Sequence, residues 1–128
     1  MCNYHVQQPC TSEGCGVAVM ARLLRNSYEE ALAFAFENGF CDKKKRVNLS
    51  QMKRFLTYLG QENVSFKKHD GASALTKNCI CHGRWDDRKN GTRHWIAFYE
   101  GVYFDPLSAH PEPELPRGFY VTQIFKHP

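Results

Sequence analysis

Apolar residues recur with a helical period through the first half of the chain. In residues 15–26 they fall at positions i, i+3, i+4 and i+7, namely Val17, Met20, Ala21 and Leu24. A stripe with this spacing predicts an amphipathic helix, which we place from Cys15 to Asn26. Gly14, directly before it, allows the chain to enter the helix sharply.

Two further helices are predicted from their end signals. Ser27 and Glu30 form a capping box for the second helix, and Gly39 stands where a C-terminal cap belongs. Asn48 is the expected N-cap of a third helix, which ends at Gly60. The apolar stripes are Tyr28, Leu32, Ala35 and Phe36 in the second helix and Met52, Phe55, Leu56 and Leu59 in the third.

After Gly60 the pattern changes to short extended segments rich in β-branched and aromatic residues. We predict strands at residues 64–68, 79–82, 95–99, 102–104 and 119–125. Prolines make the segment before the last strand a loop, because proline cannot donate to a ladder. With no internal repeat and no linker, this order predicts one α+β domain over residues 1–128, with a mainly antiparallel sheet.

The segment around Glu100-Gly101 is a candidate hairpin whose strands carry His94 and lead to Asp105. If these two residues form the loop, Tyr99 opposes Val102, and Asp105 then projects from the same face as His94. Diagonal neighbours on such a face lie roughly 7 to 8 Å apart at Cα, within reach of a carboxylate–imidazole hydrogen bond. The hairpin therefore predicts a histidine held by an acid.

Cys15 is the candidate nucleophile for such a histidine. A helix N-terminus and a protonated imidazole both stabilise a thiolate, and Cys15 gains both if His94 comes near. Cys15, His94 and Asp105 would then form the triad of a cysteine hydrolase. Taken alone, Cys15 also fits an ordinary buried thiol. The oxyanion needs a donor, which Gln8, or else Gln7, would supply together with the backbone N–H of Cys15.

At these residues the chain resembles the papain-like cysteine peptidases, and within them the compact bacterial group related to double-glycine leader peptidases. The matching segments are Gln8, Cys15-Gly16-Val17-Ala18, His94-Trp95-Ile96-Ala97, Val102-Tyr103-Phe104-Asp105-Pro106 and, in the middle, Leu49-Ser50-Gln51-Met52 to Tyr58-Leu59-Gly60. Together they cover most of the chain.

The resemblance implies a papain-like fold and a role for each matching residue. Cys15 would attack a carbonyl carbon, His94 would move the proton, Asp105 would orient His94, and Gln8 would help to bind the oxyanion. Gln8 stands one residue further from Cys15 than the family pattern has it. Related folds also perform deamidation and acyl transfer, so the resemblance implies attack on an amide or related acyl bond, with a peptide or protein as substrate.

Composition adds a cellular context to this hypothesis. The 128 residues, 42% of them hydrophobic, suffice for one globular core. No stretch approaches the roughly 20 apolar residues of a membrane helix, and the first fifteen residues lack the apolar run of a signal peptide. We therefore expect a cytoplasmic protein with reduced thiols, no cofactor and no membrane contact.

The formal net charge of +4 includes the run Lys43-Lys44-Lys45-Arg46. Such a run could contact phosphates or an acidic partner. We favour a solvated loop between helices, because no aromatic residue is interleaved with it and no nucleic-acid motif surrounds it. A nucleic-acid partner is therefore not expected.

Two other classes of function compete with the hydrolase. Cys79, Cys81 and His82 could bind zinc in an interaction module, with a fourth ligand from Cys2, His5 or Cys10. On a strand, however, Cys79 and Cys81 point to one face and His82 to the other, which favours buried thiols. The second competitor is an inactive binding protein on a hydrolase scaffold. Residues 84–93 form a charged loop that either shapes substrate access or is solvated.

Overall fold

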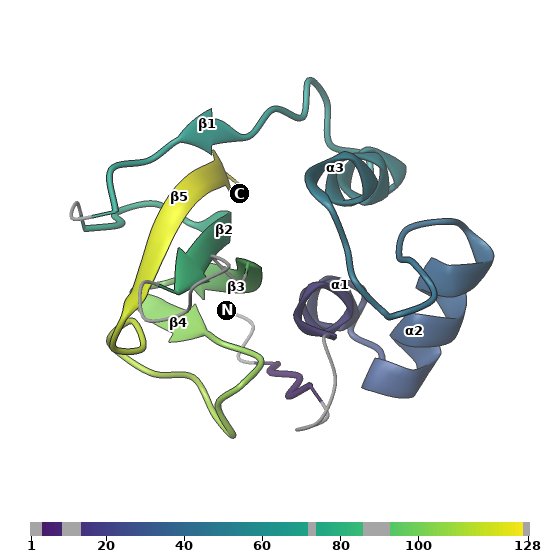
Figure 1. Ribbon diagram of the computed structural model, residues 1–128, viewed down its shortest axis with the longest axis horizontal. Helices are drawn as coiled ribbons and strands as arrows, with labels where there is room; N and C mark the ends of the chain where they lie inside the picture. Colours follow the sequence, from purple (N-terminus) through teal and green to yellow (C-terminus); the bar gives the residue numbers. More distant parts are fainter. Residues whose placement is uncertain (1–3, 9–13, 72–73, 86–92, 127–128) are drawn as a thin grey trace.

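Helices and strands occupy opposite sides of the molecule (Figure 1). The computed structural model describes residues 4–8, 14–71, 74–85 and 93–126. Three helices come first, α1 (Cys15–Leu24), α2 (Tyr28–Glu37) and α3 (Leu49–Tyr58). Five strands follow, β1 (Lys67–Lys68), β2 (Cys79–Trp85), β3 (Arg93–Tyr99), β4 (Val102–Phe104) and β5 (Phe119–Lys126). The predicted α+β class is confirmed.

The strands form one antiparallel sheet in the order β1-β5-β2-β3-β4. Its register sets the two faces, since residues directly opposite one another share a face. His82 opposes Trp95 and Ala97 opposes Phe104, and this face packs against the helices in the main hydrophobic core. The other face carries a second apolar cluster, consisting of Cys79, Cys81, Ile96, Phe98, Tyr103, Phe119 and Val121.

Helix α1 lies between the sheet and α2 (Figure 1). Residues 15–22 are consequently buried on every side, not only along the predicted stripe. The helix ends at Leu24, two residues before the predicted Asn26, because Arg25 adopts the left-handed conformation of a C-terminal cap, with φ of 58°. The predicted capping boxes at Ser27 and Asn48 are both formed.

Several strand boundaries differ from the prediction. The strand expected at residues 64–68 contributes only Lys67 and Lys68 to the ladder, and Phe66, just before them, packs against Trp95 and Phe125. Strand β2 continues beyond His82 to Trp85, and β3 begins at Arg93. The ends of the predicted charged loop are therefore strand, and residues 86–92 lie outside the described residues. Among the described residues, none of the helices has the length and apolar character needed to cross a membrane.

Candidate active site

Cys15 is the first residue of α1, a helix that is buried along most of its length. Cys15 is only 9% exposed and follows Gly14, whose carbonyl accepts the first helical hydrogen bond from Ala18 N–H. A Cβ atom on Gly14 would overlap the ring of Tyr28. Gly14 is thus required by the close approach of Tyr28, and not by an unusual backbone angle, since its φ is −86°.

The histidine and the acid meet as the hairpin predicts. Glu100 and Gly101 both have positive φ, as a two-residue turn of this type requires, and Tyr99 pairs with Val102. The His94 Nε2 atom lies 2.6 Å from Asp105 Oδ1, and both side chains are buried. The backbone N–H of Leu107 donates to the same carboxylate oxygen at 3.0 Å and holds it in place.

The imidazole of His94 interacts with both other members of the triad. Burial lowers its pKa, but hydrogen bonds to Asp105 and Cys15 and the charges of both groups raise it, to about 9. Since Nε2 faces Asp105, the other ring nitrogen, Nδ1, is the one left for the thiol. Cys15 Sγ also accepts the backbone N–H of Trp95 at 3.4 Å. The site therefore favours the protonated form of His94, next to a Cys15 sulfur that already accepts one hydrogen bond.

Aromatic rings fix the plane of the imidazole. The ring of Phe119 meets that of His94 edge-on at 5.4 Å, and the ring of Trp85 lies 5.7 Å away. Both rings belong to the apolar cluster on the sheet face that points away from the helices. The strand ends that carry Trp85 and Phe119 therefore belong to the structure of the site.

Gln8 lies beside the acid. Its backbone N–H donates to the carbonyl of Pro106 at 2.8 Å, and its side chain is buried, whereas Gln7 is exposed. A second contact joins segment 4–8 to the residues that follow Asp105: His5 Nε2 lies 2.8 Å from the carbonyl oxygen of Ser108. Of the two glutamines, Gln8 is the one placed among the buried residues of the site. Residues 9–13, which connect it to the helix, lie outside the described part of the chain.

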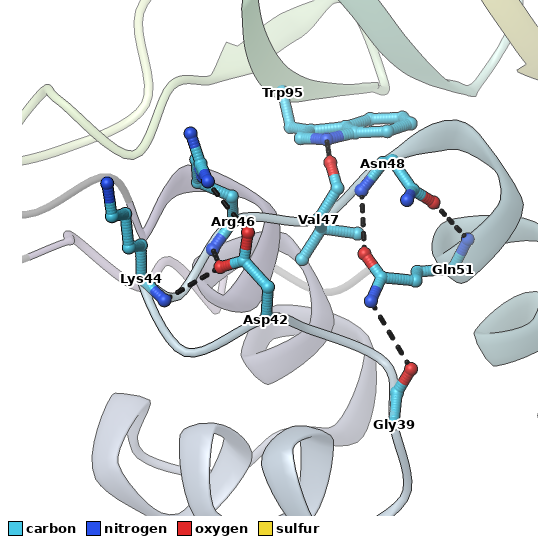
Figure 2. A network of polar contacts seen from close by, with 8 residues as sticks. All are labelled: Gly39, Asp42, Lys44, Arg46, Val47, Asn48, Gln51 and Trp95. Carbon is cyan, nitrogen blue, oxygen red and sulfur yellow. Dashed lines mark hydrogen bonds and ion pairs between the residues drawn. The ribbon is translucent and has the colours of Figure 1, made fainter.

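Trp95 joins the two layers of the molecule at the site. Its indole N–H donates to the carbonyl of Val47 at 2.8 Å (Figure 2). Gly16 fits beneath this pair, since a Cβ atom there would lie 2.6 Å from Val47 and 3.1 Å from Trp95. Sequence reasoning missed this contact. Trp95 adjoins His94 and Gly16 adjoins Cys15, so the contact holds the strand of His94 and the helix of Cys15 in a fixed relative position.

His82 is a second buried histidine that the triad does not use. Its ring packs on Trp95 at 4.3 Å, and its Nδ1 lies 3.4 Å from Gln123 Oε1. Burial lowers the pKa of His82 to about 4, with the nearby charges of Arg93 and His94 acting in the same direction. His82 is therefore a neutral ring at physiological pH, and it supports the indole of Trp95.

The cysteines of β2 do not converge with His82 on a metal ion. Cys79 and Cys81 are buried on the face away from the helices with their sulfurs 3.5 Å apart, whereas His82 lies on the opposite face. His5 is engaged with Ser108, and the remaining proposed ligands, Cys2 and Cys10, lie outside the described residues. Within the described ranges no three His, Cys, Asp or Glu side chains form a group able to hold a metal.

A comparison with known protein families finds no match for the chain, and neither does a comparison with curated protein sequences. A thiol, an imidazole and a carboxylate in hydrogen-bonded sequence, at a helix N-terminus, can generate a nucleophile and return its proton to a leaving group.

Proposed function

We propose that the protein is a cysteine hydrolase that cleaves an amide or related acyl bond through Cys15, His94 and Asp105. The observation that carries the proposal is the continuous contact from the thiol through the imidazole to the buried carboxylate. The chain's resemblance to papain-like peptidases agrees with this arrangement, in which a helix bears the thiol and an antiparallel hairpin bears the base and the acid. On that basis we also propose a papain-like fold and a peptide or protein substrate.

The reaction proceeds in two steps. The sulfur of Cys15 attacks the carbonyl carbon, and His94 gives its proton to the departing amine as the carbon–nitrogen bond breaks. A water molecule then enters, gives a proton to His94 and attacks the thioester, which releases the acid and the thiol. Asp105 holds the imidazole in one orientation throughout and stabilises its charged form.

The oxyanion formed in each step needs hydrogen-bond donors. The backbone N–H of Cys15, at the start of α1, is not required by the helix and is available for this purpose. We assign the second donor to the side-chain amide of Gln8, because it is buried beside Pro106 in the same site. Replacement of Gln8 by Glu would remove the donor with little change in size and should slow turnover more than alkylation of the thiol.

Cysteine alkylation tests the central step. Iodoacetamide at pH 7 should modify Cys15 roughly tenfold faster than an ordinary thiol, because the proposed ion pair with His94 favours the reactive thiolate, whereas an ordinary thiol is only a few per cent thiolate at that pH. Cys41 is the matched control within the same chain. It is almost equally buried, 6% against 9% exposed, but burial and Asp42 raise the pKa of its thiol.

Peptide mapping by mass spectrometry reads the rate at each thiol. The variant His94→Ala should bring the rate at Cys15 down toward that of Cys41. Equal rates at Cys15 and Cys41 in the unmodified protein would refute the proposal. Incubation of the protein with cell lysate, followed by mapping of an acyl group on Cys15, would then identify the substrate.

A further inference from the structure

A rigid loop of positive charge stands next to the proposed nucleophile. Residues 42–46, here called the basic loop, connect α2 to α3 and contain four cations against one carboxylate. Asp42 accepts hydrogen bonds from the backbone N–H groups of Lys44 and Arg46 at 2.8 and 2.9 Å, and from the Arg46 guanidinium at 3.0 Å (Figure 2). Lys45 closes the turn with φ of 68°.

This hydrogen bonding distinguishes the basic loop from a solvated run of charges. One carboxylate organises three donors, so the backbone is fixed while Lys43 and Lys44 remain exposed. The side chains of Lys44 and Arg46 extend from the side of the loop on which Trp95 lies (Figure 2). A backbone ordered in this way keeps the attachment points of the cations in place, so a ligand need not order the loop itself.

The basic loop is anchored directly at the active site. Val47, the residue that follows it, is buried and accepts the indole N–H of Trp95, and it packs on Gly16. Gly16 follows Cys15 in the chain and Trp95 follows His94. The loop therefore borders the nucleophile from the helical layer.

A second group of cations borders the site from the sheet. Arg84 on β2 lies directly opposite Arg93 on β3, and both are exposed on the face that carries His82 and Trp95. Like charges directly opposite one another destabilise a sheet by roughly 0.2 to 1 kcal/mol. An anion bound between the two guanidinium groups would remove that cost. The side chain of Arg93 projects to the face of Trp95, whose backbone N–H donates to Cys15 Sγ, so this anion would lie on the helix-facing side of the strand ends.

We propose that the substrate is an acidic polypeptide segment, whose carboxylates flank the bond to be cleaved and contact the basic loop on one side and Arg84 with Arg93 on the other. This inference rests on the proposed hydrolase function, and it names the substrate class of the same site. Cations on both the helical layer and the sheet would steer an acidic chain toward Cys15 and would disfavour a basic one.

Three matched electrophilic peptides test the substrate class, namely chloroacetyl-Gly-Glu-Glu-Glu, chloroacetyl-Gly-Gln-Gln-Gln and chloroacetyl-Gly-Lys-Lys-Lys. Each alkylates a thiolate with loss of chloride, and each rate at Cys15 is divided by the iodoacetamide rate of the same protein. The acidic probe should react roughly tenfold faster than the neutral one at low salt, and the lysine probe more slowly. In about 1 M salt, where charges are screened within about 3 Å, the difference should disappear.

Charge variants locate the source of the preference. Lys43→Glu combined with Lys44→Glu should abolish or invert the ratio of acidic to neutral probe. The matched control is Lys67→Glu with Lys68→Glu, the same change on the exposed strand β1 at the far edge of the sheet, which should leave the ratio unaltered. Arg84→Gln should lower the ratio without loss of thermal stability, because it removes a repulsive pair.

The outcomes separate this inference from the function on which it rests. Selective alkylation of Cys15 by iodoacetamide, with equal rates for the acidic and neutral probes, overturns the substrate class and leaves the hydrolase. Absence of selective alkylation overturns the hydrolase itself. Equal loss of preference in the control variant overturns the assignment to the basic loop. Equal probe rates together with binding of a short RNA oligonucleotide that Lys43→Glu/Lys44→Glu weakens would assign the loop to nucleic acid instead.

Discussion

The raised pKa of His94 links the stability of the protein to pH in a direction that can be measured. Its folded-state pKa of about 9 lies above the value of 6.5 for an unperturbed histidine. A group whose pKa is raised on folding stabilises the folded state while it is protonated in both states, and this contribution is lost as pH rises through the folded pKa. His94 therefore stabilises fully below about pH 6.5 and progressively less up to and beyond about pH 9.

The size of the effect follows from the two pKa values. Each pKa unit corresponds to about 1.4 kcal/mol, so the rise from 6.5 to about 9 amounts to about 3 kcal/mol. The side chains of His94 and Asp105 are only 4% and 3% exposed, so solvent screens their interaction little. This value is an upper limit, because it belongs to the coupled, hydrogen-bonded groups of the site and not to His94 alone.

Urea unfolding at a series of pH values between 6 and 10, with the unmodified protein and His94→Gln, measures this contribution. The difference between the two proteins isolates His94, because the other titrating groups are common to both. The free energy of unfolding of the unmodified protein should fall by up to about 3 kcal/mol more than that of the variant across this range. Parallel curves, or a difference that grows with pH, would refute the hydrogen-bonded triad as the source of the raised pKa.

Three further substitutions test the parts of the site separately. Asp105→Ala should slow alkylation of Cys15 at pH 7 by roughly tenfold or more, whereas Asp105→Asn should lose less of the rate, because its amide oxygen can still accept from the imidazole although the stabilising charge is gone; equal losses would contradict the orienting role. Gly16→Ala should destabilise the protein by about 1 to 3 kcal/mol through overlap with Val47, measured by chemical denaturation, and addition of Val47→Ala should recover part of the loss if the overlap is the cause. Trp95→Phe should cost about 1 to 3 kcal/mol, because it leaves the carbonyl of Val47 without its indole donor, and unchanged stability would show that the bond is replaced by water.

The sequence was sufficient to predict those elements that are set by residues close together in the chain. The capping pairs at Ser27 and Asn48 fix the starts of two helices within a few residues of chain. The two-residue turn at Glu100 and Gly101 fixes the register of β3 against β4, and alternation then brings His94 and Asp105 to one face. This part of the site could be predicted because the turn length alone decides which side chains meet.

Contacts between segments that are distant in the chain could not be predicted from local sequence patterns. The indole of Trp95 meets the carbonyl of Val47 across 48 residues, and the fit of Gly16 beneath them depends on how the helices dock on the sheet. The position of His82 over Trp95 depends on the register of β2 against β3, which no short turn specifies. The strand expected at residues 64–68 pairs only at Lys67 and Lys68, because its pairing partner, β5, lies far along the chain and no short turn sets their register.

Cys15 and His94 are carried by different layers, and the Trp95–Val47 hydrogen bond fastens one layer to the other beside them. Any motion that slides the helices over the sheet by a fraction of a side chain would part sulfur from imidazole while both layers keep their own secondary structure. On heating, the fast alkylation of Cys15 should therefore be lost before the circular dichroism of the helices and strands changes. The reactivity of Cys15 would therefore report how firmly the helical layer is docked on the sheet.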